Sequence, residues 1–79
     1  MVPLYGFLKG DTLGLLLIVH DVDTIAQVAE NLAQAAAVRV AAAGRKRVYH
    51  EGRELEPTQT VAHAGLSALD RIDVVAEVE

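Results

Sequence analysis

A single amphipathic segment with a marked start constrains the fold of this chain more than any other feature. Thr24 is followed three residues later by Gln27, the spacing of a capping box, in which each side chain satisfies a backbone N–H of the first helical turn. Behind this start, apolar residues recur on one helical face: Ile25, Val28, Ala29, Leu32 and Ala36. A helix with one apolar face must bury it against another element. The sequence therefore predicts one helix that packs on a sheet built from the rest of the chain.

Two strands are predicted before the helix. Val2 to Leu8 is rich in aromatic and branched residues, and Leu13 to His20 reads as the return strand. Between them, Lys9-Gly10-Asp11 contains residues that tolerate the positive φ angles of a tight hairpin. The chain thus begins with a predicted hairpin.

Short elements are predicted after the helix. The pattern from Val38 to Ala43 is ambiguous, and Gly44 ends it. Lys46 to His50 and Arg53 to Leu55 are predicted as short strands joined by a turn at Glu51-Gly52. The second of these strands stops before a proline, which cannot donate to a strand ladder.

The last third of the sequence predicts a turn and a closing strand. Thr60 to Leu66 is predicted as a single helical turn closed by Gly65. Arg71 to Val78 alternates inward and outward residues and is predicted as the closing strand. With 79 residues, of which 52% are hydrophobic, the chain has material for one modest core. We therefore predict a single α+β domain over residues 1–79, with one helix packed across a mixed four- to five-stranded sheet.

In this order, several short segments resemble ubiquitin and its β-grasp relatives over nearly the whole chain. They are Leu8-Lys9-Gly10-Asp11-Thr12 at the first hairpin, Asp23-Thr24-Ile25 at the helix start, Gly52-Arg53-Glu54-Leu55, Thr60-Val61, Gly65-Leu66, and Ile72-Asp73-Val74-Val75 in the last strand. Together and in register, they imply a ubiquitin-like β-grasp fold.

A second set of segments is similar to the toluene-4-monooxygenase protein B family, the small subunit of bacterial multicomponent diiron aromatic monooxygenases. These segments are Asp21-Val22-Asp23, Gln27-Val28-Ala29-Glu30, Arg39-Val40-Ala41, Ala62-His63-Ala64-Gly65-Leu66 and Ile72-Asp73-Val74-Val75. The resemblance implies a non-catalytic accessory subunit whose partner is the large hydroxylase subunit, which holds the diiron centre.

The sequence contains no motif that indicates catalysis or cofactor binding. His20, His50 and His63 lie far apart, without metal-ligand spacing, and Ser67 lacks the context of a nucleophile. Gly44, Gly52 and Gly65 form no phosphate-binding pattern. We therefore predict no catalytic, cofactor-binding or metal-ligating residue and no bound cofactor.

Two other functions stay open beside the accessory subunit. One is a free-standing bacterial ubiquitin-like adaptor, of the kind that accompanies type VII secretion. The other is a conjugated modifier, which is disfavoured because the sequence ends Val75-Ala76-Glu77-Val78-Glu79 without Gly-Gly. Neighbouring genes would separate the three.

Charge and hydropathy limit the classes of partner that the sequence predicts. A formal net charge of −4 argues against nucleic acid as a partner. The longest apolar run, Leu13 to Val19, is shorter than the about 20 residues that span a membrane. The absence of cysteine and of a signal peptide favours the cytoplasm.

A protein-docking face is predicted on the outside of the sheet. Alternation leaves Leu16 and Ile18 on the opposite face from Leu15 and Leu17, so one pair of bulky apolar groups stays outside. The resemblance to ubiquitin adds Leu8, Tyr49 and Val75, which match its apolar recognition patch. Scattered exposed apolar residues, common to all proteins, are the alternative explanation.

Two further expectations concern this face. In the register that the resemblance to ubiquitin implies, Tyr49 points outward. It is predicted to anchor the partner, because tyrosine combines a large ring with few torsions. Arg47 belongs to a basic cluster with Arg45, Lys46 and Arg53. That cluster either protects a solvated strand edge or steers an acidic partner surface.

Overall fold

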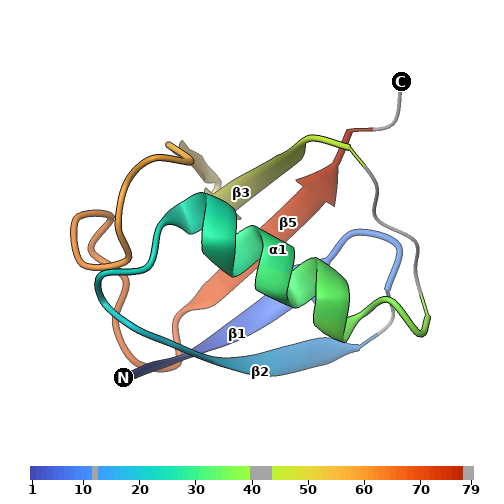
Figure 1. Ribbon diagram of the computed structural model, residues 1–79, viewed down its shortest axis with the longest axis horizontal. Coiled ribbons are helices and arrows are strands. Elements are labelled where there is room, and N and C mark those ends of the chain that lie inside the picture. The colour runs from blue at the N-terminus through green and yellow to red at the C-terminus, as the bar shows by residue number, and fades with distance from the viewer. Residues whose placement is uncertain (12, 40–43, 78–79) are drawn as a thin grey trace.

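The computed structural model describes residues 1–11, 13–39 and 44–77. These residues form one helix on one sheet, with elements in the order β1 (Val2–Leu8), β2 (Gly14–Val19), α1 (Ile25–Ala35), β3 (Lys46–His50), β4 (Arg53–Leu55) and β5 (Arg71–Ala76). The strand order across the sheet is β2-β1-β5-β3-β4. β1 and β5 run parallel, whereas the other neighbouring strands are antiparallel. The predicted α+β architecture, one helix across a mixed sheet, is confirmed (Figure 1).

The helix starts as its sequence predicts. The Gln27 N–H donates to Thr24 Oγ1 at 3.2 Å, and the Thr24 N–H donates to Gln27 Oε1 at 2.9 Å, so the capping box is complete. The buried face contains every residue that the periodicity selects, together with one more alanine: Ile25, Val28, Ala29, Leu32, Ala33 and the C-cap Ala36. Because this face is apolar, α1 covers one side of the sheet (Figure 1).

Close approach of α1 to β1 depends on a glycine. A Cβ atom on Gly6 would lie 2.9 Å from Leu32 Cδ1, so a larger residue would require the Leu32 side chain to shift. Around this contact the inner face of the sheet supplies most of the remaining core: Leu4, Leu8, Leu17, Val19, Val48, Leu55, Ile72 and Val74. The turn after β4 adds Val61, Ala64 and Leu66, so the core is built from the helix, the sheet and this turn.

The first hairpin turn is tied to the segment after the helix. Gly10 has a φ of 97°, the conformation expected for this turn, and the Asp11 N–H donates to the Leu8 carbonyl at 2.9 Å. Arg39 donates through Nε and a terminal nitrogen to the two Asp11 carboxylate oxygens, both at 2.9 Å. This bidentate pair raises the pKa of Arg39 and links the hairpin to the end of the helical region.

Several predicted boundaries differ from the observed ones. β2 is one residue shorter at each end than Leu13 to His20, and β5 ends at Ala76, with Val78 outside the described residues. The segment from Thr60 to Leu66 forms a turn with one bond of helical spacing, from the Ala64 N–H to the Thr60 carbonyl, and no helix is assigned there. Of the ambiguous stretch, residues 40–43, and with them part of Arg39-Val40-Ala41, lie outside the described residues, as does Thr12.

Candidate functional site

The face of the sheet opposite α1 is the predicted docking face, and strand alternation decides which side chains it carries. In β3, Val48 is buried while its neighbours Arg47 and Tyr49 lie on the other side. In β2, Leu17 and Val19 are buried whereas Leu16 and Ile18 are 55% and 57% exposed. The predicted outward positions of Arg47 and Tyr49 are therefore confirmed. For β2, where the sequence left the choice of face open, the outward pair is Leu16 and Ile18.

Leu8 is the exception. The resemblance to ubiquitin predicted Leu8 in the exposed patch of the docking face, but its side chain is 2% exposed and belongs to the core. Leu8 lies beside Val74 in the parallel pairing of β1 and β5, and Leu4 and Leu8 share the inward parity of β1. The prediction was wrong because the similarity to ubiquitin's patch does not fix the strand parity at this position.

Four side chains form the apolar outer patch: Pro3, Tyr5, Leu16 and Ile18. Pro3 lies opposite Ile18, and Tyr5 lies opposite Leu16, in the antiparallel pairing of β1 with β2. Directly opposed residues share a face, with Cβ atoms about 5 Å apart, so the four side chains are adjacent. Tyr5 is 44% exposed. This end of the outer face is apolar and open to solvent.

Four other side chains form the mixed outer patch: Arg47, Tyr49, Asp73 and Val75. Arg47 lies opposite Val75, and Tyr49 opposite Asp73, in the antiparallel pairing of β3 with β5. Arg47 forms an ion pair with Glu77. A hydrogen bond with Tyr49, followed by the charge of Glu77, raises the pKa of Arg47. This end of the face is polar and internally paired.

Phe7 and Arg71 separate the two patches. The Arg71 guanidinium lies 4.0 Å from the centroid of the Phe7 ring, and it also contacts Asp73 Oδ1 at 3.0 Å. The Phe7 ring covers Gly14, where a Cβ atom would lie 2.4 Å from the ring. The structure thus brings Leu16 and Ile18 together at one end and Arg47, Tyr49 and Val75 at the other, rather than all in one patch.

Sequence reasoning missed two members of the apolar outer patch, Pro3 and Tyr5. The alternation of Val2 to Leu8 contained the signal, because Leu4 and Leu8 on one face require Pro3 and Tyr5 on the other. Their position next to Leu16 and Ile18 depends on the hairpin register, which the structure provides.

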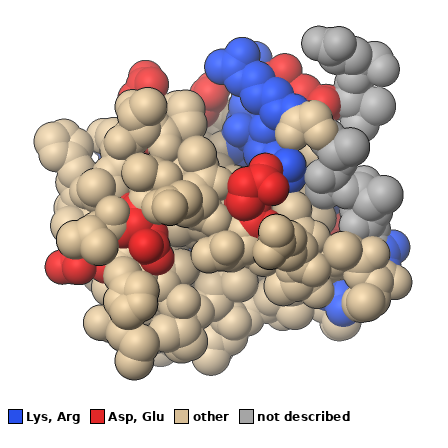
Figure 2. Space-filling model, viewed as in Figure 1, with Lys and Arg blue, Asp and Glu red and all other residues tan. Residues whose placement is uncertain are grey.

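The predicted basic cluster is not a single surface. The Lys46 side chain is 7% exposed, and its Nζ lies 2.8 Å from Glu30 Oε1 on α1. Arg47 points to the outer face, as its pairing with Val75 requires. Figure 2 shows blue side chains gathered toward the β3 side of the face that carries α1. Alternation along β3 therefore sends Lys46 and Arg47 to opposite sides of the sheet.

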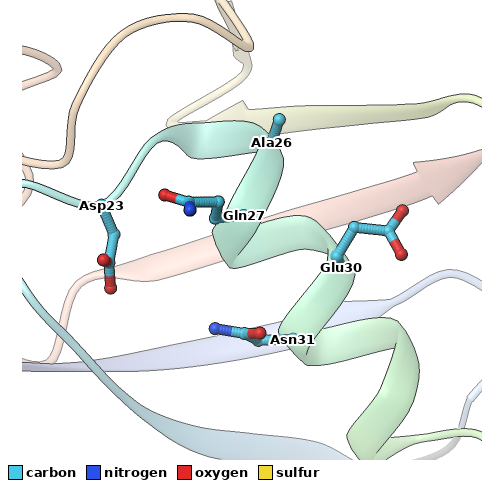
Figure 3. A pocket seen from close by; sticks show the side chains of 5 residues that line it. All are labelled: Asp23, Ala26, Gln27, Glu30 and Asn31. Atoms are coloured by element: carbon cyan, nitrogen blue, oxygen red, sulfur yellow. The ribbon is translucent and has the colours of Figure 1, made fainter.

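A shallow hollow of about 290 Å³ lies on the exposed side of α1, lined by Asp23, Ala26, Gln27, Glu30 and Asn31 (Figure 3). Two of its polar groups already serve the helix start. Asp23 Oδ2 accepts a hydrogen bond from the His20 N–H at 2.9 Å, and Gln27 completes the capping box. The hollow is therefore a by-product of the cap and the helix surface.

The described ranges contain no group of three or more His, Cys, Asp or Glu residues that could hold a metal ion. In the same ranges, no helix is long and apolar enough to cross a membrane.

Comparisons with known proteins give two levels of similarity. The family model of toluene-4-monooxygenase system protein B (TmoB) matches residues 1–75. A chain of a toluene 4-monooxygenase HD complex with the inhibitor 4-bromobenzoate superposes with a TM-score of 0.88 at 32% identity, covering 96% of this chain and 98% of that chain. The sequence matches no curated protein significantly.

The second level is the fold. A ubiquitin of Caldiarchaeum subterraneum superposes with a TM-score of 0.78 at 17% identity, covering 99% of this chain and 95% of that one. The ubiquitin-like domain of Plasmodium falciparum Dsk2 gives 0.75 at 13% identity, with 96% and 97% covered. These similarities confirm the predicted ubiquitin-like β-grasp fold.

Proposed function

This chain belongs to the toluene-4-monooxygenase system protein B family, and from that premise we propose that it is a non-catalytic accessory subunit of a diiron aromatic-ring monooxygenase. The observation that carries the proposal is the similarity to a chain of a toluene 4-monooxygenase complex, at 32% identity over 96% of this chain and 98% of that one. A match at this coverage leaves no large part of either chain unaccounted for. The proposed partner is the large hydroxylase subunit, which holds the iron. The proposed location of the complex is the cytoplasm.

The outer face of the sheet is the docking surface in this proposal. The apolar outer patch supplies the area whose removal from water drives association, at roughly 25 cal/mol per Å² of apolar surface. The mixed outer patch supplies charges at the margin, where they steer the encounter more than they hold the complex. Leu16 and Ile18 thus act as anchors, with Arg47, Tyr49 and Val75 at the rim.

Co-expression with the large subunit from the same organism tests the proposal. We expect the two chains to co-purify at fixed stoichiometry, and iron to remain with the large subunit. Native mass spectrometry and iron analysis of the separated subunits give both readouts. A large subunit that assembles and turns over fully without this chain, and that does not bind it at micromolar concentration, would contradict the proposal.

The free-standing adaptor gains no support from the ubiquitin-like neighbours. Their identities of 17% and 13% show a shared fold, and a fold of this kind serves many unrelated partners. The accessory subunit is therefore the function that the observations favour.

A further inference from the structure

β2 lies at one margin of the sheet and is unusually unprotected there. It pairs with β1, and the described sheet places no strand on its other side. Its six residues, Gly14–Val19, include no charged side chain and no proline. Margin strands of soluble proteins are normally shortened, charged or interrupted, because an open strand edge is a template for another chain. This margin has none of these protections.

The pairing of β1 identifies the open backbone groups of β2. The Tyr5 N–H donates to the Asp70 carbonyl at 2.9 Å, on the β5 side of β1. Tyr5 therefore does not exchange backbone hydrogen bonds with Leu16, which lies opposite it. The N–H and C=O of Leu16 consequently point away from β1. By alternation, those of Gly14 and Ile18 do the same.

Gly14, Leu16 and Ile18 determine which kind of peptide segment can pair with this edge. Each offers one donor and one acceptor in the plane of the sheet, so an added strand can form up to about six backbone hydrogen bonds. The side chains of Leu16 and Ile18 stand on the outer face, 55% and 57% exposed. An extended segment with apolar residues at alternate positions would complete both the backbone bonds and the apolar outer patch.

Charge marks one end of the edge. Asp21 lies two residues after the end of β2, is exposed, and forms no ion pair with any described residue. Asp23 accepts the His20 N–H and likewise has no described cationic partner. Figure 2 shows neither blue nor red along the middle of the lower margin, where β2 runs in Figure 1. A fitting segment is thus apolar, with Lys or Arg at the end that lies beside Asp21.

We propose that the open edge of β2 is a strand-addition site for an extended, apolar segment of the large subunit that ends in a basic residue. The inference rests on the proposed function, since it assigns the contact through which that partner binds. A second copy of this chain is the competing occupant. It would place edges of the same sequence together, with a net charge of −4 on each copy.

Hydrogen exchange at single amides tests the site on the wild-type complex. The labelled chain is exchanged free and bound to the large subunit, quenched, separated and read by NMR. We expect the Leu16 and Ile18 amides to exchange about a hundredfold more slowly in the complex, while the Leu15 and Leu17 amides are already protected in the free chain. A stable complex in which Leu16 and Ile18 exchange as in the free chain would overturn the edge site and leave the proposed function standing. Failure to form a complex would overturn both.

A pair of substitutions separates the backbone from the side chain. Leu16→Pro removes the edge N–H without removing a bond to β1, whereas Leu16→Ala keeps that N–H and shortens the side chain. We expect Leu16→Pro to bind at least about tenfold more weakly than Leu16→Ala, with circular dichroism showing that both fold. Equal affinity of the two folded variants would overturn the site. So would protection of Leu16 in the free chain together with a dimer mass in sedimentation, because it would assign the edge to a second copy.

Discussion

The two ends of the sheet differ in what they expose. At one margin, β2 runs for six residues without a charge, and the adjoining outer face carries the apolar outer patch. At the other margin, β4 has three residues, two of them Arg53 and Glu54, and the adjoining outer face carries ion-paired groups. Both margins belong to one sheet under one helix, so the fold alone does not require the difference.

The β4 end has the features that normally keep an edge strand from pairing with another chain in water, because the strand is short and carries charged side chains. The β2 end breaks them, and exposure of an apolar strand edge is a liability unless something covers it. The contrast therefore separates a charged margin, which resists pairing with another chain, from the margin at which we propose that the partner docks. Four substitutions can break or sharpen that contrast.

The largest effect is expected under the β2 end of the sheet. Leu32 is fully buried against Gly6 of β1, so Leu32→Ala leaves a cavity and should lower the free energy of unfolding by ~2–5 kcal/mol. Gln34→Ala, on the exposed side of α1, should change it by less than about 0.5 kcal/mol. Urea unfolding followed by circular dichroism measures both. Equal decreases in the free energy of unfolding would mean that α1 does not face the sheet through Leu32.

Ile18→Asp should have the largest effect on binding. Ile18 is 57% exposed, so the variant should fold, but its carboxylate would lose water in the contact. Affinity for the large subunit should fall by ~2 kcal/mol or more, about thirtyfold. Calorimetric titration provides the measurement, with Glu54→Gln on β4 as the control that should bind like wild type. The reverse ranking would assign docking to the β4 end.

Tyr49→Ala tests whether the contact reaches the mixed outer patch. Tyr49 is half-buried and hydrogen-bonded to Arg47, so it has less surface to lose to a partner than Ile18. We expect a loss of about 1 kcal/mol, roughly fivefold in affinity, with little change in stability. An unchanged affinity would confine docking to the apolar outer patch. A larger loss than that of Ile18→Asp would restore Tyr49 as the anchor that its sequence context predicts.

Arg47→Glu should have the smallest effect, and a kinetic one. Rim charges act mainly on the encounter, so association should slow by about threefold at low salt and approach the wild-type rate as salt rises. Stopped-flow measurement at several ionic strengths gives this dependence. Val75→Ala, at the uncharged position opposite Arg47, serves as the matched variant, whose association rate should not depend on salt more than that of wild type. A slowing that is independent of salt would count against steering.

The sequence by itself determined the helix and most strands. A capping box and a single apolar face are local signals, and every residue that they selected for burial is buried: Ile25, Val28, Ala29, Leu32 and Ala36. Alternation likewise separated Leu16 and Ile18 from Leu15 and Leu17, but only the structure shows that Leu16 and Ile18 are the outward pair. These predictions succeed because period and capping depend on residues a few positions apart.

Tertiary structure decided where those faces lie and what adjoins them. Leu8 is buried because α1 covers its side of β1, and the Lys46 side chain lies against the same side of the sheet because its Nζ pairs with Glu30 of α1. Leu16 has an open edge because β1 takes β5 as its other neighbour, which leaves β2 at the margin. Strand order is a long-range property, set by which pairings bury the core together, and local sequence carries no direct record of it. The sequence thus determined which residues share a face of each strand, and the pairing of distant strands decided which face and which edge stay open to solvent.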